Sequence, residues 1–179
     1  MALEGTAKPG FRADGTVEVP DFRLPPSELS SAEAQAMQRM RARFAGRAPE
    51  PLDDIAQSRA QLDAMLAPQV ARMLELYPVT IEESEIGGVP VRIITPADND
   101  YDRDRVLMNL HGGAFSVCWH SCSLLESVPI AAVGKYRIVS TNYRMAPEAQ
   151  HPAGVEDAAA AYKALLEEFS PDRNGVVGC

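Results

Sequence analysis

The sequence predicts an α/β protein built on a mostly parallel, twisted sheet. After Pro78, two strand-forming segments, residues 79–86 and 89–95, are joined by Gly87-Gly88, a signal for a hairpin. Strand, helix, strand, helix and strand patterns then alternate up to Cys179, as expected for parallel strands connected by helices. With 179 residues, 46% of them apolar, the chain is long enough to form one sizeable core.

The part of the chain before Pro78 predicts an extended arm and two helices. Residues 1–26 are rich in glycine, proline and charge. A first helix is expected from Ser27, a suitable N-cap, to Gly46, and a second from near Pro51 to Leu76. Both helices carry methionines on their apolar faces, which suit core packing or a lid that contacts an apolar ligand. From the residues alone, core packing is favoured.

The elements after the hairpin follow in order along the chain. The pattern predicts an Asp-rich surface loop over 98–104, a buried strand over 106–110, a helix over 123–133, a strand over 137–142, an amphipathic helix over 155–169 and a last strand over 174–179. Glu156 and Asp157 lie in the first turn of the amphipathic helix, where carboxylates suit the positive end of the helix dipole.

Composition excludes several classes of protein. The net charge is −8, with acidic residues scattered along the chain, which argues against a nucleic-acid-binding surface. No apolar run reaches the roughly 20 residues of a membrane span. The first fifteen residues lack the pattern of an export signal, so a cytoplasmic location is expected. Three cysteines, an odd number, predict no disulfide framework and fit a reducing compartment.

The strand over 106–110 runs directly into His111-Gly112-Gly113-Ala114. Two adjacent glycines let the backbone adopt positive φ or approach another group closely. Such a turn can aim backbone N–H groups at a developing oxyanion. A tight turn after a core strand is the alternative, and these residues alone do not separate the two interpretations.

Two further motifs follow at informative spacing. Residues 143–148 read YRMAPE and residues 151–158 read HPAGVEDA. Together with HGGAF at 111–115 they resemble the hormone-sensitive-lipase-like branch of the α/β-hydrolases, which includes bacterial carboxylesterases and acetyl esterases. The resemblance covers about residues 79–179. It implies an α/β-hydrolase fold in which residues 1–76 form an N-terminal arm and helical lid, and residues 77–179 form the first half of the core.

The resemblance also implies roles for the residues of the turn. Gly113 and Ala114 are the expected N–H donors of the oxyanion hole, and Gly112 permits the turn. Ala114 stands where the family more commonly has a third glycine, which is costly only if its φ is positive. His111 is expected to brace the loop rather than to take part in chemistry.

No G-x-S-x-G motif occurs in the chain. Residues 176–179 resemble the strand and start of the nucleophile elbow, with Gly178 as its first glycine and Cys179 after it. The serine, acid and base are therefore expected beyond Cys179, and none of the serines after the turn (Ser116, Ser121, Ser123, Ser127) is assigned as nucleophile. We expect this chain alone to be inactive. Because residues 174–179 would be a buried central strand, a second chain or segment is expected to pack against them.

The resemblance predicts a serine carboxylesterase that acts on short- to medium-chain acyl esters through an acyl-enzyme, without a metal or organic cofactor. A non-catalytic small-molecule receptor, an amide or lactone hydrolase, and an inert fragment are alternatives. A homo-oligomer is compatible with the sequence. Cys118, His120 and Cys122 could be taken for metal ligands, but their spacing is not that of a zinc site, and small buried residues are expected there.

Overall fold

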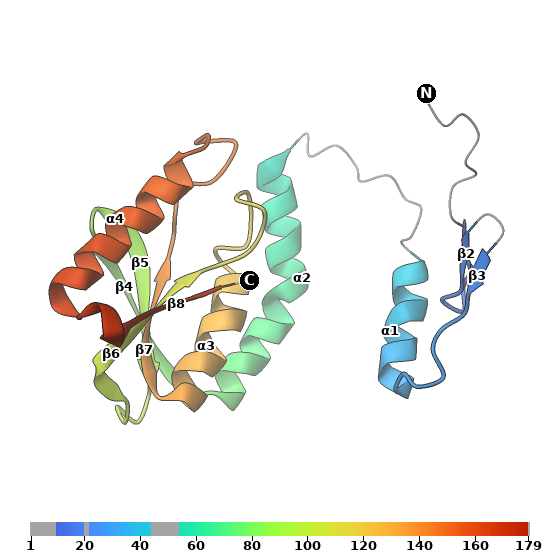
Figure 1. Ribbon diagram of the computed structural model, residues 1–179, viewed down its shortest axis with the longest axis horizontal. Coiled ribbons are helices and arrows are strands. Elements are labelled where there is room, and N and C mark those ends of the chain that lie inside the picture. The colour runs from blue at the N-terminus through green and yellow to red at the C-terminus, as the bar shows by residue number, and fades with distance from the viewer. Residues whose placement is uncertain (1–9, 20–21, 44–53, 179) are drawn as a thin grey trace. The chain divides into compact units, whose positions relative to one another are not determined.

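The computed structural model describes residues 10–19, 22–43 and 54–178. The chain forms two compact units, Met1–Pro51 and Leu52–Cys179, which are treated separately below (Figure 1). The second expected helix belongs to the second unit, so the compact units divide at Pro51 rather than at residue 76. The assignment of residues 1–76 to a functional arm and lid stays a prediction.

The first unit contains a small antiparallel sheet and one helix. Its strands β1 (Gly10–Phe11), β2 (Val17–Val19) and β3 (Phe22–Leu24) pair in that order, where the sequence predicted only an extended arm. Helix α1 (Ala32–Ala42) begins after Ser31, whose hydroxyl accepts a hydrogen bond from the Ala34 N–H at 3.2 Å. The predicted N-cap Ser27 instead opens a turn closed by the Ser30 N–H. The expected end of the helix, residues 44–46, lies outside the described residues.

The second unit has a five-stranded sheet of order β4-β5-β7-β6-β8. Its strands are β4 (Val79–Ile86), β5 (Val89–Pro96), β6 (Asp102–Leu110), β7 (Tyr136–Thr141) and β8 (Asn174–Gly178). β6 is parallel to β7 and to β8, whereas β5 is antiparallel to β4 and β7. Four strands therefore share one direction, which confirms the mostly parallel sheet. β6 begins at Asp102, inside the predicted Asp-rich loop. Its first residues are polar and exposed, so no apolar pattern marked them as a strand.

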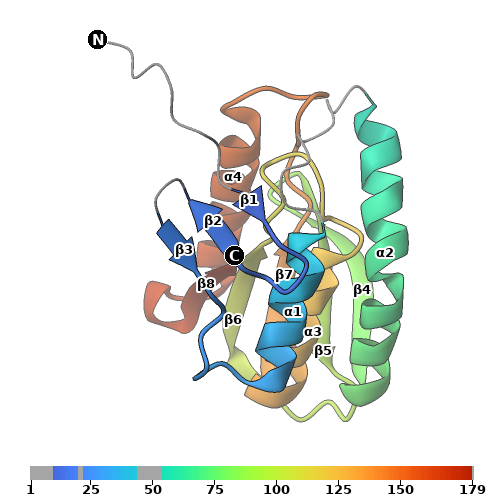
Figure 2. The same cartoon turned by 90° about the vertical axis from the view of Figure 1, so that its right-hand side faces the viewer.

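Helices cover both faces of this sheet. Helix α4 (Ala153–Glu168) lies on one face, and α3 (Cys122–Gly134) lies on the other, with α2 (Ile55–Leu76) alongside α3 (Figure 1 and Figure 2). The strands supply side chains to both layers: Val139 packs under α4, and its neighbour Ile138 packs under α3. Burial on both faces explains the consecutive apolar residues at 106–108 in β6 and 138–139 in β7.

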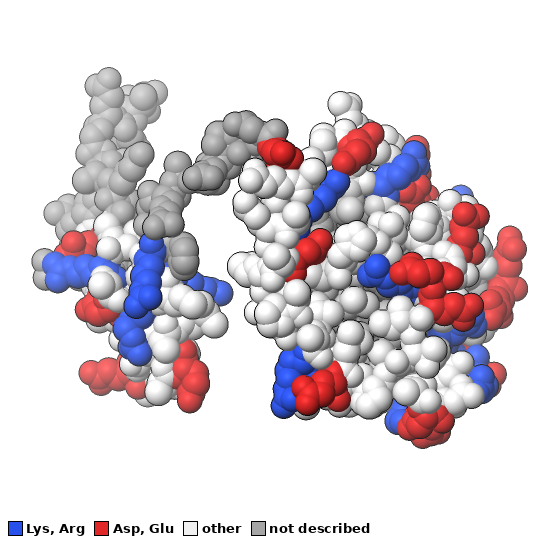
Figure 3. Space-filling model, turned by 180° about the vertical axis from the view of Figure 1, so that it is seen from behind, with Lys and Arg blue, Asp and Glu red and all other residues white. Residues whose placement is uncertain are grey.

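Strand β8 pairs only with β6 among the described residues, and the side chain of Val176 is 55% exposed. The central position expected for this strand stays a prediction. In the described part of the chain, no helix is both long and apolar enough to cross a bilayer. Acidic and basic side chains are interspersed over the face of the second unit seen in Figure 3.

Candidate active site

The chain turns sharply where β6 ends at Leu110. Gly113, Ala114 and Phe115 have φ values of +109°, +52° and +57°. The Gly113 carbonyl accepts hydrogen bonds from the N–H groups of Ser116 (3.0 Å) and Val117 (3.2 Å), which close the turn. A Cβ at Gly113 would lie 2.3 Å from the Val117 carbonyl oxygen, so only glycine fits. Ala114 has the positive φ that makes an alanine costly.

The N–H groups of the turn differ in their partners. Gly112 donates to Glu126 Oε1 at 3.5 Å. Within the described residues, the N–H groups of Gly113 and Ala114 donate no hydrogen bond. Both residues line a cavity of about 350 Å³, whose wall also includes Tyr143. Its other lining residues are Leu110, His111, Gly112, Phe115, Gly154, Val155 and Ala158. This arrangement has the composition expected of an anion-accepting turn beside an apolar pocket.

His111 is buried directly beside this turn, with 2% of its surface exposed. Its Nδ1 lies 2.8 Å from the Gly112 carbonyl oxygen, an arrangement that places the ring proton on Nδ1. The ring stacks on Tyr143 at a centroid distance of 4.5 Å, and the Tyr143 hydroxyl donates to the His111 carbonyl. Burial holds the pKa of His111 below its usual value. These contacts support the bracing role expected of His111, which stays a prediction.

A chain of polar side chains behind the turn escaped the sequence analysis. Ser140 on β7 donates to Asn109 Oδ1 at 3.0 Å, and Asn109 Nδ2 donates to Glu126 Oε2 at 2.9 Å. Asn109 and Ser140 are fully buried. Glu126, on α3, thereby connects the strands to Gly112. The signal in the sequence was a single amide inside the apolar run VLMNL, since a buried amide needs partners.

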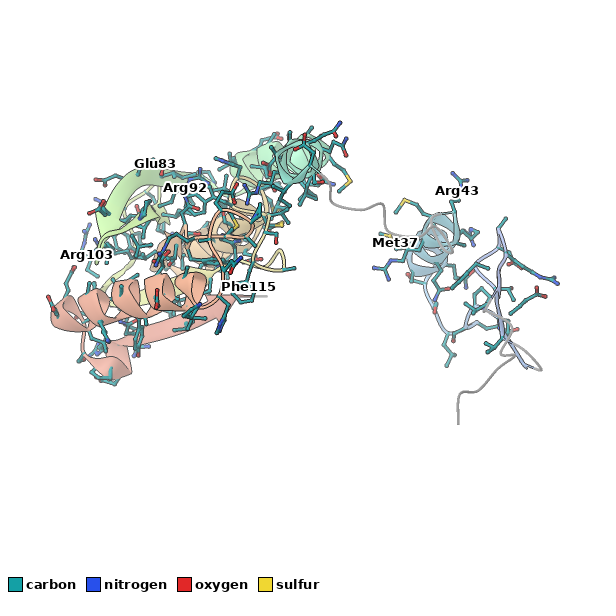
Figure 4. All side chains as sticks on the ribbon, turned by 90° about the horizontal axis from the view of Figure 1, so that it is seen from above. Met37, Arg43, Glu83, Arg92, Arg103 and Phe115 are labelled. Carbon is teal, nitrogen blue, oxygen red and sulfur yellow. A yellow bond between two sulfur atoms is a disulfide. The ribbon has the colours of Figure 1, made fainter. Side chains whose placement is uncertain are left out.

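The YRMAPE segment forms a loop that lies against the turn. The Ala146 N–H donates to the Phe115 carbonyl at 2.7 Å. Figure 4 shows Phe115 near the beginning of α4. Asp157 accepts hydrogen bonds from the backbone N–H (2.7 Å) and the guanidinium of Arg144, and these contacts lower the pKa of Asp157. Asp157 thus fixes this loop, a role beyond the helix-start position that the sequence predicted.

Arg59 on α2 contacts both loops, and sequence reasoning missed it. Its Nε donates to the Ser116 carbonyl at 2.7 Å, and its Nη2 donates to the Ala146 carbonyl at 2.8 Å. The same guanidinium forms two hydrogen bonds with the Glu148 carboxylate, at 2.6 and 2.9 Å. These hydrogen bonds lower the pKa of Glu148 to about 2. Arg59 is partly buried, but nothing local in the helix pattern distinguishes it from the exposed arginines of the chain.

The loop between the turn and α3 corrects one expectation. Cys118 and Cys122 form a disulfide, whereas the sequence predicted no disulfide and two small buried residues. Both half-cystines are partly buried, and His120 is exposed. The described residues contain no group of three or more His, Cys, Asp and Glu side chains arranged to hold a metal ion. Trp119, between the two half-cystines, lies under the Arg92 guanidinium at 4.2 Å, and Figure 4 shows Arg92 close to Glu83.

Strand β8 ends beside the start of the turn. It pairs in parallel with β6, with Gly178 opposite Leu110. A Cβ at Gly178 would lie 2.3 Å from the Leu110 carbonyl oxygen, which explains the glycine. Cys179 lies outside the described residues. Three of the serines after the turn donate elsewhere: Ser116 to the Ala114 carbonyl, Ser121 to Asp63, and Ser123 to the Trp119 carbonyl. The hydroxyl of Ser127 is buried without a partner among the described residues.

Comparisons with known proteins identify the kind of fold. A family model described as "alpha/beta hydrolase fold" matches residues 107–179. A carboxylesterase of Mycobacterium tuberculosis is 34% identical over 143 residues, covering 70% of this chain and 41% of the relative. An arylacetamide deacetylase of Oryctolagus cuniculus is 32% identical over 109 residues, covering 56% of this chain and 27% of the relative.

Solved structures of esterases and lipases have a similar fold. A hormone-sensitive lipase from a metagenome library superposes with a TM-score of 0.61 and 28% identity, over 74% of this chain and 42% of that one. An esterase of the bacterial hormone-sensitive lipase family gives 0.65 and 25%, over 84% and 48%. The chain therefore spans less than half the length of each of these four proteins.

Proposed function

Because this chain belongs to the hormone-sensitive-lipase-like branch of the α/β-hydrolases, we propose that it forms part of a carboxylic ester hydrolase. The observation that carries the proposal is the pair of N–H groups on Gly113 and Ala114, which have no partner among the described residues and lie on residues that line the 350 Å³ cavity. These N–H groups would bind the oxyanion of the tetrahedral intermediate. A serine, an acid and a histidine would come from a segment that follows Gly178, and this chain alone would be inactive.

In this mechanism the serine hydroxyl attacks the ester carbonyl while the histidine accepts its proton. The histidine then protonates the departing alcohol, and water hydrolyses the acyl-enzyme by the same route. Each oxyanion-hole donor accounts for roughly 10²–10³ in kcat in well-studied hydrolases. The parallel pairing of Gly178 with Leu110 supports an elbow beside this turn. The apolar cavity wall, with Leu110, Phe115 and Val155, suits an acyl chain of short to medium length.

Amide hydrolysis is a second candidate, favoured by the similarity to an arylacetamide deacetylase. The oxyanion turn serves both reactions, because both pass through a tetrahedral intermediate. Parallel assays of an aryl acetate and the matching aryl acetamide separate the two. Because an aryl ester is intrinsically the more reactive substrate, hydrolysis of the acetate without measurable hydrolysis of the acetamide supports the esterase proposal, and hydrolysis of the acetamide supports the amide hydrolase.

The first experiment combines intact mass spectrometry of the native protein with an assay on chromogenic acyl esters. We expect ester hydrolysis only in preparations where a serine-containing segment accompanies this chain. Gly113→Ala should lower kcat by about 10² or more, because a Cβ there collides with the Val117 carbonyl. Gly88→Ala is the matched control, since Gly88 also has positive φ but a Cβ there meets nothing within 4 Å. Full activity of Gly113→Ala would refute the oxyanion assignment. If a preparation that contains the serine-bearing segment hydrolyses neither ester nor amide, the enzyme proposal is wrong.

A further inference from the structure

We infer that Arg59 is a positioning residue that holds the oxyanion turn in shape from helix α2. The structural part of this inference stands on the contacts of Arg59 alone. Its catalytic consequence rests on the proposed function. The inference assigns α2 a role in building the site, in addition to any role in covering it.

The turn needs an external support because its backbone is strained. Residues 113–115 all have positive φ, and only the first of the three is glycine. A backbone of this kind persists only where surrounding contacts fix it. Inside the turn, the carbonyls of Gly113 and Ala114 accept hydrogen bonds from residues of the turn itself. The carbonyls of Phe115 and Ser116 accept from donors outside the turn.

Arg59 supplies the support at this open end of the turn. The Ala146 N–H donates to the Phe115 carbonyl, which joins the two loops. The guanidinium of Arg59 donates to one carbonyl on each side of that hydrogen bond. On the turn it donates to the carbonyl of Ser116, the residue after Phe115. On the other loop it donates to the carbonyl of Ala146 itself. A planar fork of donors can serve these acceptors together, whereas the ammonium of a lysine is a single point charge.

Two further contacts fix the position of Arg59 and of the helix that carries it. Glu148 binds the guanidinium through both carboxylate oxygens, so the fork is oriented by a residue of the same loop that carries Ala146. Asp63 accepts a hydrogen bond from Ser121 at 2.6 Å. Asp63 lies four residues after Arg59, so both side chains project from one face of α2. That face of the helix contacts the loop at both of its ends.

Amide hydrogen exchange of the 179-residue chain tests this inference without requiring activity. In Arg59→Met, exchange at the Ser116 and Val117 amides should accelerate about tenfold or more, because the turn loses a charge-assisted hydrogen bond. Arg72→Met is the matched control on the same helix, because Arg72 pairs with Glu75 on the surface and its side chain is 57% exposed. It should leave exchange at Ser116 and Val117 unchanged.

Milder variants keep the test decisive if Arg59→Met does not fold. Arg59→Lys should accelerate exchange at the Ser116 and Val117 amides less than Arg59→Met does. Glu148→Gln should accelerate it less than Arg59→Lys does, because Glu148→Gln leaves both backbone contacts of Arg59 in place. If the Ser116 and Val117 amides exchange no faster in Arg59→Lys than in Arg72→Met, the inference is overturned. In an ester-hydrolysing preparation, Arg59→Lys should lower kcat and leave KM nearly unchanged. Faster exchange in Arg59→Met, together with no ester hydrolysis by a wild-type preparation that contains the serine-bearing segment, would refute the proposed function and leave the positioning role intact.

Discussion

Ala114 provides a quantitative test of the geometry of the turn. Its φ is +52°, and the residue is exposed, so its methyl group buries little surface. The left-handed conformation costs an L-residue roughly 1–2 kcal/mol relative to glycine. Glycine loses about 0.5–1 kcal/mol more chain entropy on folding than alanine does. Ala114→Gly should therefore raise the free energy of unfolding by about 0.5–1 kcal/mol.

Thermal and urea denaturation measure this difference, and an increase of about 2–4 °C in Tm is expected for a unit of this size. Ala159→Gly is the matched control, because Ala159 is an exposed alanine inside helix α4. There the same substitution should lower stability by about 1 kcal/mol. The two variants should thus differ in sign. If Ala114→Gly destabilises the protein as much as Ala159→Gly, residue 114 does not adopt the left-handed conformation and the described turn is wrong.

Three other predictions address the surroundings of the turn. Burial lowers the pKa of His111, so below pH 6.5 the unfolded chain binds a proton that the folded chain does not. The free energy of unfolding should therefore fall as the pH drops below 6.5. An NMR titration midpoint of His111 at or above 6.5 would contradict this. The disulfide between Cys118 and Cys122 predicts one free thiol in the denatured, unreduced chain and three after reduction, and three before reduction would disprove it. Glu126→Ala should accelerate amide exchange at Gly112 about three- to tenfold, whereas Glu126→Gln, which keeps an acceptor, should not; equal rates in the two variants would exclude the contact.

The elements of the second unit were predictable because their signals are local. The Gly87-Gly88 hairpin occurs where expected, and both glycines have positive φ. Helices α3 and α4 lie within two residues of their predicted limits. Apolar periodicity and turn residues determine such elements over short stretches of sequence. The HGG turn was identifiable for the same reason.

The contacts that support the turn were not predictable, because they join residues far apart in the sequence. Arg59 is separated by 57 residues from Ser116 and by 89 from Glu148, and no pattern in a surface helix indicates such partners. The Cys118–Cys122 disulfide depends on how the loop folds back onto α3. The short strands of the first unit lack the length and alternation from which strands are recognised.

The chain contains a single tryptophan, and it lies in the loop that follows the turn at residues 112–115. Trp119 is 93% buried, with the Arg92 guanidinium 4.2 Å from its ring and the His111 ring at 6.0 Å. The indole is therefore a built-in fluorescent reporter whose emission depends on the placement of those two neighbours. We expect reduction of the adjacent disulfide and loosening of the loop to change this emission, with no label attached to the protein.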